Sequence, residues 1–307
     1  MSEKEKLAFR DISQDFSKNT GNYTTILQKK NGNFKSELPH PFLKWAGGKR
    51  QLISQMHRYF PKNFNKYIEP FIGGGAVFFY LKPKFSIIID INEELINCYK
   101  VVKNNVKELI ELLKTRKNEK NYYYKIRALD RNLEKYDKLS NIEKASRMIY
   151  LNKCCYNGLY RVNSKGEFNV PFGKYKNPNF CDEKNLLAVS KALGNVKIIL
   201  GSFEKCLDYT EKGDFVYFDP PYHPISKTSS FTSYTKENFG KESQIKLFKV
   251  FKKLDELGGK LMLSNSYNVY IKNLYQNYKT ITLDARRVIN CNAAKRGKIK
   301  ELLILNY

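Results

Sequence analysis

Two short runs of apolar residues, each closed by an aspartate, constrain the fold of this chain most strongly. Ser86–Ile91 reads SIIIDI, and Phe215–Phe218 reads FVYF directly before Asp219. Runs this apolar are typical of strands that are buried on both faces, which occur in parallel sheets covered by helices. The sequence therefore predicts an α/β protein in which both strands end at a carboxylate.

Strand and helix patterns alternate on both sides of a long interruption. From about residue 105 to residue 183, helical patterns are followed by a turn-rich stretch in which Ser164–Gly166 (SKG) indicates a β-hairpin. A parallel-type sheet is therefore expected to flank an inserted, basic, mostly helical segment. The expected strands are Lys66–Glu69, Ser86–Ile91, Lys197–Leu200, Phe215–Phe218, Lys260–Leu263, Thr280–Leu283 and Glu301–Leu305, and the expected helices of the insertion are Val106–Thr115, Tyr122–Tyr136 and Ile142–Cys154.

Residues 1–38 are rich in polar side chains and carry no sustained hydrophobic period, so we expect a flexible tail. The expected regions are this tail, a main α/β domain formed by 39–104 together with 184–307, and an inserted domain at 105–183. No apolar run approaches the roughly 20 residues that a membrane span requires, and the N-terminus lacks the apolar core of a secretion signal. A soluble, cytoplasmic protein without a membrane partner is expected.

The charge balance favours a polyanionic partner. The chain carries 55 Lys and Arg residues against 30 Asp and Glu residues, a formal net charge of +25. Tyr and Phe side chains are interleaved with the basic residues, as at Tyr122–Arg127 (YYYKIR), and no basic amphipathic helix with a clean apolar face indicates a membrane surface. Nucleic acid is therefore the preferred partner; the alternative is a lysine-rich surface that only solvates the protein.

The cysteines and histidines indicate neither a disulfide framework nor a metal site. Six cysteines are scattered without a C-x-x-C pair, and His40, His57 and His223 are far apart in the sequence. This usage is typical of a reducing compartment, and no bound metal is expected.

Two features at the ends of predicted strands are typical of a nucleotide-like cofactor site. The glycines of Glu69–Gly75 (EPFIGGG) allow a backbone to approach a ligand closely, although they do not identify the ligand. Asp90 ends the next strand about twenty residues further on, where open α/β sheets hold ribose hydroxyls; a helix N-cap is the alternative role. Gly47–Arg50 (GGKR) is no phosphate-binding P-loop, because neither Ser nor Thr follows the lysine.

The tetrapeptide Asp219–Tyr222 (DPPY) directly follows the strand FVYF. Its prolines stop the strand abruptly, so the Asp219 carboxylate, the Pro220 carbonyl and the Tyr222 ring are expected to project together from the sheet edge. The two oxygens can accept hydrogen bonds from the amino group of a flat base while the ring stacks on it. Drawing both N–H bonds toward acceptors frees the nitrogen lone pair for attack on an electrophilic methyl group. The alternative is a strand-ending turn with a core tyrosine.

These motifs belong to a longer pattern from Pro41 to Tyr307, and over that span the chain resembles the Dam-type DNA adenine methyltransferases of bacteria and their viruses, including those of restriction-modification systems. The resemblance implies a Rossmann-like S-adenosylmethionine-dependent methyltransferase sheet with an inserted, mostly helical target-recognition domain. The shared motifs, in the family's order, are PFLKWAGGKRQL at Pro41–Leu52, EPFIGGGAVFF from Glu69, DINEELINCY at Asp90–Tyr99, YNGLYRVNSKGEFNVPFGKYKNP at Tyr156–Pro178, DPPY, and SSFTSYT at Ser229–Thr235.

The resemblance implies S-adenosylmethionine as the cofactor. Phe203 sits where the family often has Gly-Asp-Phe against the cofactor adenine; here Ser202 replaces the aspartate with a hydroxyl that can still form a hydrogen bond. The implied catalytic residues are Asp219, Pro220 and Tyr222. The implied cofactor-binding residues are Trp45, Lys49, Glu69, Phe71, Gly73, Gly75, Asp90, Phe203 and Asp219.

The resemblance also implies that a loop of the inserted domain enters the DNA and reads GATC. Arg161 matches the guanine reader, since a guanidinium fork fits O6 and N7 of guanine; a phosphate clamp is the alternative role. Lys44 adds a guanine contact in this picture, and Lys153 stands where some relatives have arginine and keeps a phosphate contact. The implied DNA-binding residues are Lys44, Lys153, Tyr156, Asn157, Leu159 and Arg161.

The expected function is methyl transfer to the N6 amino group of adenine in double-stranded DNA, most often in GATC, after the target base has left the stack. We expect a monomer that is associated with the nucleoid; the sequence leaves open whether a cognate restriction endonuclease acts separately. The alternatives are the same chemistry on RNA adenine or cytosine N4, and a non-catalytic DNA-binding module.

Overall fold

The computed structural model of the protein describes residues 38–222, 239–286 and 298–307. The predicted tail, apart from Leu38, and the Ser229–Thr235 motif lie outside these residues. Among the described helices, none combines the length and the apolar character that crossing a bilayer requires.

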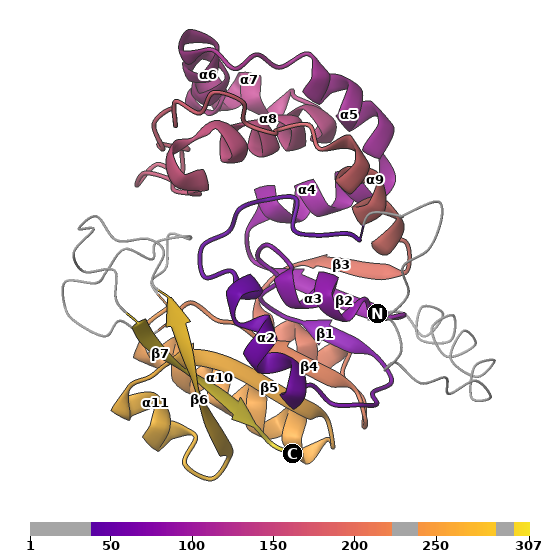
Figure 1. Ribbon diagram of the computed structural model, residues 1–307, viewed down its shortest axis with the longest axis vertical. Helices are drawn as coiled ribbons and strands as arrows, with labels where there is room; N and C mark the ends of the chain where they lie inside the picture. Colours follow the sequence, from indigo (N-terminus) through magenta and orange to yellow (C-terminus); the bar gives the residue numbers. More distant parts are fainter. Residues whose placement is uncertain (1–37, 223–238, 287–297) are drawn as a thin grey trace. The chain divides into compact units, whose positions relative to one another are not determined.

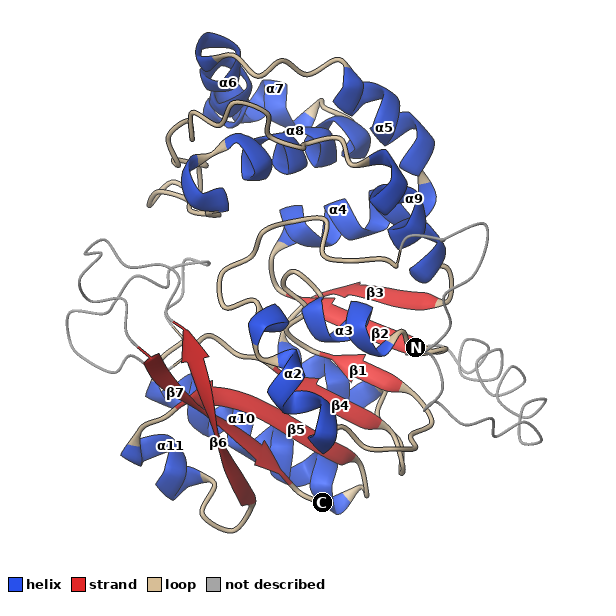
Figure 2. Cartoon of the chain, viewed as in Figure 1, coloured by secondary structure: helices blue, strands red, loops and turns tan. Residues whose placement is uncertain are grey.

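The described strands form one sheet in the order β3-β2-β1-β4-β5-β7-β6 (Figure 2). Neighbouring strands from β3 to β5 are parallel, as predicted, whereas β7 is antiparallel to both β5 and β6. Only 11 residues separate β6 from β7, too few for the crossover that a parallel neighbour needs, so the chain returns in the opposite direction. The strands are β1 (Tyr67–Glu69), β2 (Ser86–Asp90), β3 (Val196–Leu200), β4 (Phe215–Phe218), β5 (Lys260–Ser266), β6 (Lys279–Arg286) and β7 (Lys298–Leu305).

The strand order reverses between β1 and β4, which pair with each other at Tyr67↔Phe215. The strands that follow β1 lie on one side of this point and those that follow β4 lie on the other. At such a switch point the loops after the two strands diverge, which leaves a crevice at their carboxyl ends. Glu69 ends β1 and Asp219 follows β4, so both residues flank this crevice.

Alternate side chains of the central strands enter two separate apolar cores. Ile88 and Tyr217 belong to a core shared with α3 and α4, whereas Ile87 and Phe218 belong to a core shared with α10. This alternation follows from the two-residue period of a strand and explains why apolar side chains occupy consecutive positions in the runs SIIID and FVYF. The helices outside the insertion are α2 (Ile53–Met56), α3 (Ala76–Leu81), α4 (Glu93–Asn104), α9 (Glu183–Ala192), α10 (Lys241–Glu256) and α11 (Val269–Leu274).

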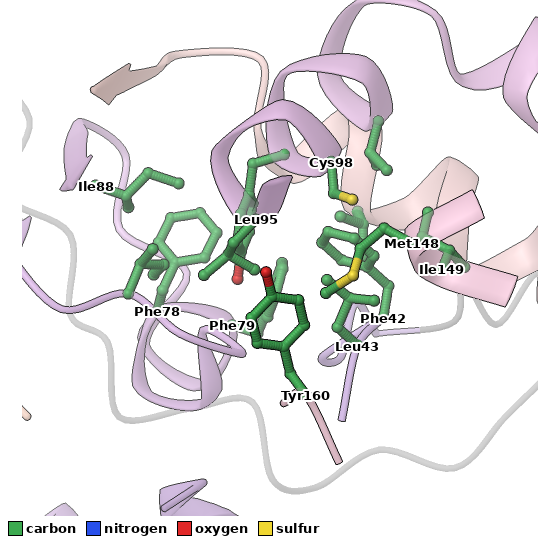
Figure 3. Close-up of a cluster of buried hydrophobic side chains, with 14 of the residues drawn as sticks. Phe42, Leu43, Phe78, Phe79, Ile88, Leu95, Cys98, Met148, Ile149 and Tyr160 are labelled. Carbon is green, nitrogen blue, oxygen red and sulfur yellow. The ribbon is translucent and has the colours of Figure 1, made fainter. Parts of the chain in front are cut away.

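The inserted segment is mostly helical, as predicted, and packs on the sheet part of the protein through α4 (Figure 1). Its longest helix, α8, begins at a capping box formed by Ser140 and Glu143. Tyr160, from the turn-rich stretch, lies among side chains of α3, α4 and α8 in one continuous core (Figure 3). The helices of the insertion are α5 (Val106–Lys114), α6 (Lys120–Arg127), α7 (Leu133–Asp137) and α8 (Asn141–Cys154).

The single helix predicted at Tyr122–Tyr136 is wrong: the chain forms α6, a 3₁₀ turn at Ala128–Arg131 and then α7. The break has a tertiary cause. Asp130, in the turn, accepts a hydrogen bond from the Phe168 backbone N–H at 2.8 Å and pairs with Arg147 at 2.6 Å. The side chain of Asn132 then caps α7 by accepting the N–H of Lys135.

The predicted hairpin at Ser164–Gly166 is confirmed as a tight turn. The Gly166 N–H donates to the Asn163 carbonyl, and Val162 and Phe168 form an antiparallel bridge on either side. Gly166 has a φ of +84°, a conformation that glycine adopts without strain. The hairpin therefore presents Arg161 on its first arm.

Candidate active site

The residues predicted to carry chemistry meet where β1, β2 and β4 end. The most direct contact joins Asp219, after β4, to Lys49: the Lys49 Nζ lies 2.6 Å from the Asp219 Oδ1. The Lys49 side chain is only 3% exposed, also donates to the Gly47 carbonyl at 2.7 Å, and lies 4.7 Å from the centroid of the Tyr222 ring. The structure therefore gives Lys49, expected only as a cofactor contact, a position against the catalytic motif.

The electrostatic environment of Asp219 reflects this burial. Removal from water raises the pKa of the Asp219 carboxyl to about 6, and the Lys49 ammonium acts in the opposite direction. The carboxyl is consequently ionised above neutral pH and can accept hydrogen bonds from an N–H donor.

The Tyr222 side chain is held at its hydroxyl group. Its hydroxyl donates to the Glu301 Oε2 at 2.5 Å, and Glu301 lies on β7, where it faces Ser266 of β5 in the strand register. Burial, and then the negative charges of Asp219 and Glu301, raise the pKa of the Tyr222 hydroxyl well above its usual range. The hydroxyl thus stays protonated and remains the donor in this bond.

The backbone between Asp219 and Tyr222 is held by a hydrogen bond from α10. The Gln244 Nε2, in the first turn of α10, donates to the Pro221 carbonyl at 3.3 Å, and the Gln244 Oε1 accepts from Asn265 at 3.0 Å. No hydrogen bond to the preceding carbonyl, that of Pro220, is found among residues 38–222, 239–286 and 298–307. Within these ranges the Pro220 carbonyl, next in the sequence to Asp219, therefore has no hydrogen-bond donor.

Glu69 lies at the neighbouring strand end and is only 2% exposed. Burial raises the pKa of its carboxyl well above the usual range, while a hydrogen bond from the Tyr67 hydroxyl at 2.7 Å acts the other way. Within the described parts of the chain, no group of three or more His, Cys, Asp and Glu side chains could hold a metal ion.

The glycine loop and Asp90 form one unit. The Gly73 N–H donates to the Asp90 Oδ2 at 3.1 Å, and the Asn92 N–H donates to the Asp90 Oδ1 at 3.0 Å. Asn92, and not Asp90, caps α4, so the alternative role of Asp90 as a helix N-cap is wrong. Burial raises the pKa of Asp90 to about 6, with the backbone N–H donors acting in the opposite direction.

The loop needs glycine at two positions. Gly73 and Gly75 have φ values of +46° and +71°, and an added Cβ would lie 2.8 Å from the Trp45 ring and 2.7 Å from the Tyr99 hydroxyl, respectively. Both conformation and space therefore exclude a side chain. This close packing brings Trp45 beside the glycine loop, as expected for the cofactor-binding residues.

Two further predicted cofactor contacts lie against each other. The rings of Phe71 and Phe203 stack with centroids 5.3 Å apart, and Phe239 meets both of them edge-on. Ser202 caps the short 3₁₀ helix that begins at Phe203, so its hydroxyl has a local structural partner. The structure thus adds Phe239, which no sequence motif indicated, to this aromatic cluster.

The N-terminal motif is tied to the recognition loop. Asn152 of α8 is fully buried, and its side chain accepts from the Lys44 N–H and donates to the Lys44 carbonyl, both at 2.8 Å. The next residue, Trp45, stacks on the Tyr160 ring with centroids 5.1 Å apart. The Lys44 stem lies where a side chain on Gly158 would be, and its Nζ is 5.1 Å from the Tyr175 ring.

Tyr156, Asn157 and Leu159 follow α8 and precede the hairpin arm that carries Arg161, whereas Lys44 lies in the N-terminal motif and Lys153 in the last turn of α8. Tyr156 is 54% exposed, and Asn157 has a φ of +57°, with its N–H donating to the Tyr175 hydroxyl. The exposed Arg161 donates from Nε to the Asn169 Oδ1 at 2.6 Å and from Nη2 to the Asn169 carbonyl at 3.4 Å, so Asn169 holds one edge of its guanidinium. Burial, and then the neighbouring Lys44, lower the pKa of Lys153.

Sequence reasoning missed the residues that hold these groups in place. Glu301, Gln244, Asn152 and Asn169 are polar residues whose partners lie far away in the sequence or across a turn. One signal was available for Glu301, since a carboxylate directly before the apolar run LLIL marks a polar end to a buried strand.

Comparison with known proteins gives consistent matches. A family model described as D12 class N6 adenine-specific DNA methyltransferase matches residues 45–289. The type II methyltransferase M.MjaIII of Methanocaldococcus jannaschii is 54% identical to this chain, with 87% of this chain and 99% of the relative covered. The type II methyltransferase M1.LlaDCHI of Lactococcus lactis subsp. cremoris is 46% identical, with 92% and 99% covered. The DNA adenine methylase of Escherichia coli K12 is 36% identical, with 86% and 94% covered.

Proposed function

The chain belongs to the family of D12 class N6 adenine-specific DNA methyltransferases, and from this premise we propose that it methylates adenine in GATC with S-adenosylmethionine as the donor, using Asp219, Pro220 and Tyr222 as its catalytic residues. One observation carries the assignment of the pocket. The Lys49 ammonium, an N–H donor, lies 2.6 Å from Asp219, at a position where an adenine amino group could donate. Family membership does not favour the alternatives of an RNA or cytosine substrate or a non-catalytic module.

The pocket suits an exocyclic amine. The lone pair of the adenine amino group is delocalised into the ring, so the nitrogen is a poor nucleophile until its geometry changes. Asp219 and the open Pro220 carbonyl would accept its two N–H bonds, while Tyr222 would stack on the purine. Positioning and these acceptors, rather than a covalent intermediate, then drive the transfer.

The residues around the glycine loop fit a nucleoside cofactor. Asp90 offers a carboxylate to ribose hydroxyls, and the loop closes on it through the Gly73 N–H. Trp45, Phe71 and Phe203 supply aromatic surface next to that carboxylate. When bound, S-adenosylmethionine supplies the electrophilic methyl group. Lys49, Glu69 and Gly75 complete the proposed cofactor-binding set.

We propose that residues 105–183 form the target-recognition domain and that 39–104 with 184–307 form the catalytic domain. The exposed Tyr156, Asn157 and Arg161 support this division, because they carry polar and basic groups at the surface of the insertion. Extruding the target adenine costs a few kcal/mol, which contacts of this domain with bases and phosphates must offset. Tyr156, Asn157 and Leu159 are the proposed loop contacts, with Lys44, Lys153 and Arg161 as the basic ones.

We also propose a partner enzyme and an oligomeric state for the protein. Two relatives are named type II methyltransferases, which supports a separate cognate endonuclease acting on the same sequence. A monomer suffices for the chemistry, since every proposed catalytic and cofactor residue comes from one chain.

The test is to express the protein in a host that lacks adenine methylation and to map the modified bases genome-wide. We expect N6-methyladenine confined to GATC, and no methylation with Asp219→Ala. Asp137→Ala, which removes an exposed aspartate of α7, is the matched control and should methylate normally. Methylation at another DNA sequence would replace GATC as the proposed recognition sequence. Wild-type methylation by Asp219→Ala would contradict the catalytic role of Asp219.

A further inference from the structure

We propose that Glu301 is a positioning residue for the methyl transfer: by accepting the Tyr222 hydroxyl, it fixes the position of the ring against which the target base stacks. This inference rests on the proposed function, since it takes Tyr222 as the stacking residue. Glu301 does not lie in the DPPY motif and comes 79 residues after Tyr222 in the chain, on β7.

The backbone beside Tyr222 is fixed by other residues. Gln244 and Asn265 are both fully buried and form a chain of hydrogen bonds that ends on the Pro221 carbonyl. The Ser266 N–H donates to the Asn265 Oδ1 at 2.8 Å, so the amide of Asn265 is itself held in one orientation. With the peptide held in this way, rotation of the Tyr222 side chain is the freedom that remains.

Glu301 restricts the rotation of the Tyr222 side chain that would displace the ring. Its carboxylate lies 2.5 Å from the Tyr222 hydroxyl, and the residue is 9% exposed. Hydrogen bonds to a carboxylate are among the strong ones, and a ring held at its hydroxyl cannot swing about χ1 without breaking the bond. The same ring has the Lys49 ammonium 4.7 Å from its centroid, on the side of Asp219.

The position of Glu301 on the sheet explains why it can do this. It faces Ser266 of β5 and Leu283 of β6 in the strand register, so it is anchored by neighbours on both sides. Because β7 runs antiparallel to β5, the first part of β7 reaches the edge where the parallel strands end. The antiparallel strand β7 thereby brings the Glu301 carboxylate to the edge of the sheet where Tyr222 lies.

The first test measures methylation with tritium-labelled S-adenosylmethionine on plasmid DNA from a host lacking adenine methylation, with enzyme and cofactor saturating. We expect Glu301→Ala to lower the single-turnover rate by roughly 10- to 100-fold, the loss that a misplaced reacting group produces, with cofactor affinity unchanged. Glu301→Gln, which keeps an acceptor oxygen, should recover most of the rate. A wild-type rate for Glu301→Ala overturns the proposal.

A double-mutant cycle tests whether Glu301 acts through the Tyr222 hydroxyl. If Glu301 acts through the hydroxyl of Tyr222, then Tyr222→Phe, Glu301→Ala and the double variant should be slowed to a similar extent. Two losses that multiply in the double variant would show that Glu301 acts independently of the hydroxyl, and would overturn the proposal.

A matched tyrosine and carboxylate pair lies away from the pocket. The Tyr278 hydroxyl donates to the Asp255 Oδ2 at 3.0 Å. Tyr278→Phe and Asp255→Ala should lower the melting temperature and leave the single-turnover rate unchanged; equal slowing by both pairs would assign the effect to stability and overturn the proposal. Asp219→Ala tests the proposed function separately. Wild-type methylation by that variant would contradict the catalytic role of Asp219, whatever the result of the double-mutant cycle.

Discussion

The Lys49 ammonium lies 2.6 Å from the Asp219 carboxylate, and both groups are largely removed from water. Breaking a buried ion pair on one side leaves an unpaired charge, so removing Lys49 would leave the Asp219 carboxylate without its cation. In the proposed reaction, the adenine amino group must share Asp219 with Lys49 or replace it. The Gly47 carbonyl, 2.7 Å from Nζ, gives Lys49 an acceptor that it can keep in either case.

Replacing Lys49 should change how methylation depends on pH. Burial raises the pKa of Asp219 to about 6 while Lys49 acts against that rise, so Lys49→Met should move the pKa higher. The acceptor form is the ionised one, which exists above the pKa. We therefore expect the variant to lose more activity relative to wild type at pH 6.5 than at pH 8.5, as measured by single-turnover rates.

A matched control for this prediction is Lys66, whose Nζ pairs with the buried Asp214 at 3.1 Å before the start of β4. Lys66→Met should lower stability and leave the shape of the pH profile unchanged. A rate ratio for Lys49→Met that is constant across pH would contradict the proposed role of Lys49.

Cofactor binding should weaken in acid because of Asp90. Burial raises the pKa of Asp90 to about 6, so its carboxyl is ionised at pH 8 and increasingly protonated below pH 6. The ionised form accepts hydrogen bonds at both oxygens, and protonation removes part of that capacity. Calorimetric titration with S-adenosylmethionine should show affinity falling below pH 6 in the wild type. Asp90→Asn should bind weakly at every pH and lose this dependence; a persisting dependence would assign it to another group.

Much of the fold and the centre of the site follow from local sequence. The strands at Ser86–Asp90 and Phe215–Phe218 are predictable because burial on both faces requires apolar side chains at consecutive positions. Asp90 and Asp219 are placed by the same signal, since each stands where its strand ends. Local patterns are sufficient here because the chemistry directly follows the element that positions it.

What could not be predicted depends on contacts across the sequence. Glu301 lies 79 residues after its partner Tyr222, and only the antiparallel return of β7 brings the two together. The predicted helix at Tyr122–Tyr136 failed for a similar reason, because Asp130 is drawn toward Phe168 and Arg147. Helical spacing continues through the break and gives no sign of it.

Arg161 should carry sequence discrimination. Asn169 holds its Nε at 2.6 Å and its Nη2 at 3.4 Å, so the Nη1 end of the guanidinium is the part proposed to meet a guanine. Arg161→Ala should lose about 1 to 3 kcal/mol of discrimination between GATC and duplexes with one substituted guanine, and Arg161→Lys should also lose it because an ammonium has no fork. Competing methylation rates on the paired duplexes measure this. Lys165→Ala, on the exposed hairpin turn, serves as control; an equal loss on all sequences would make Arg161 a phosphate contact.

Arg147 should be among the most costly residues to replace in the insertion. Its guanidinium is fully buried, pairs with Asp130 at 2.6 Å and Glu94 at 3.3 Å, and donates to the Arg127 carbonyl at 2.9 Å. Arg147→Met leaves the Asp130 carboxylate buried without its cation, which should cost about 3 to 5 kcal/mol of unfolding free energy in urea titrations.

The control for Arg147 is the exposed pair Lys138 and Glu134, at 2.8 Å, where Lys138→Met should cost no more than about 1 kcal/mol. If the unpaired carboxylate is the cause of the loss, then adding Asp130→Asn to Arg147→Met should recover part of it. A double variant less stable than Arg147→Met alone would instead show that Asp130 stabilises the insertion mainly through the Phe168 N–H, which it accepts at 2.8 Å beside the hairpin that carries Arg161.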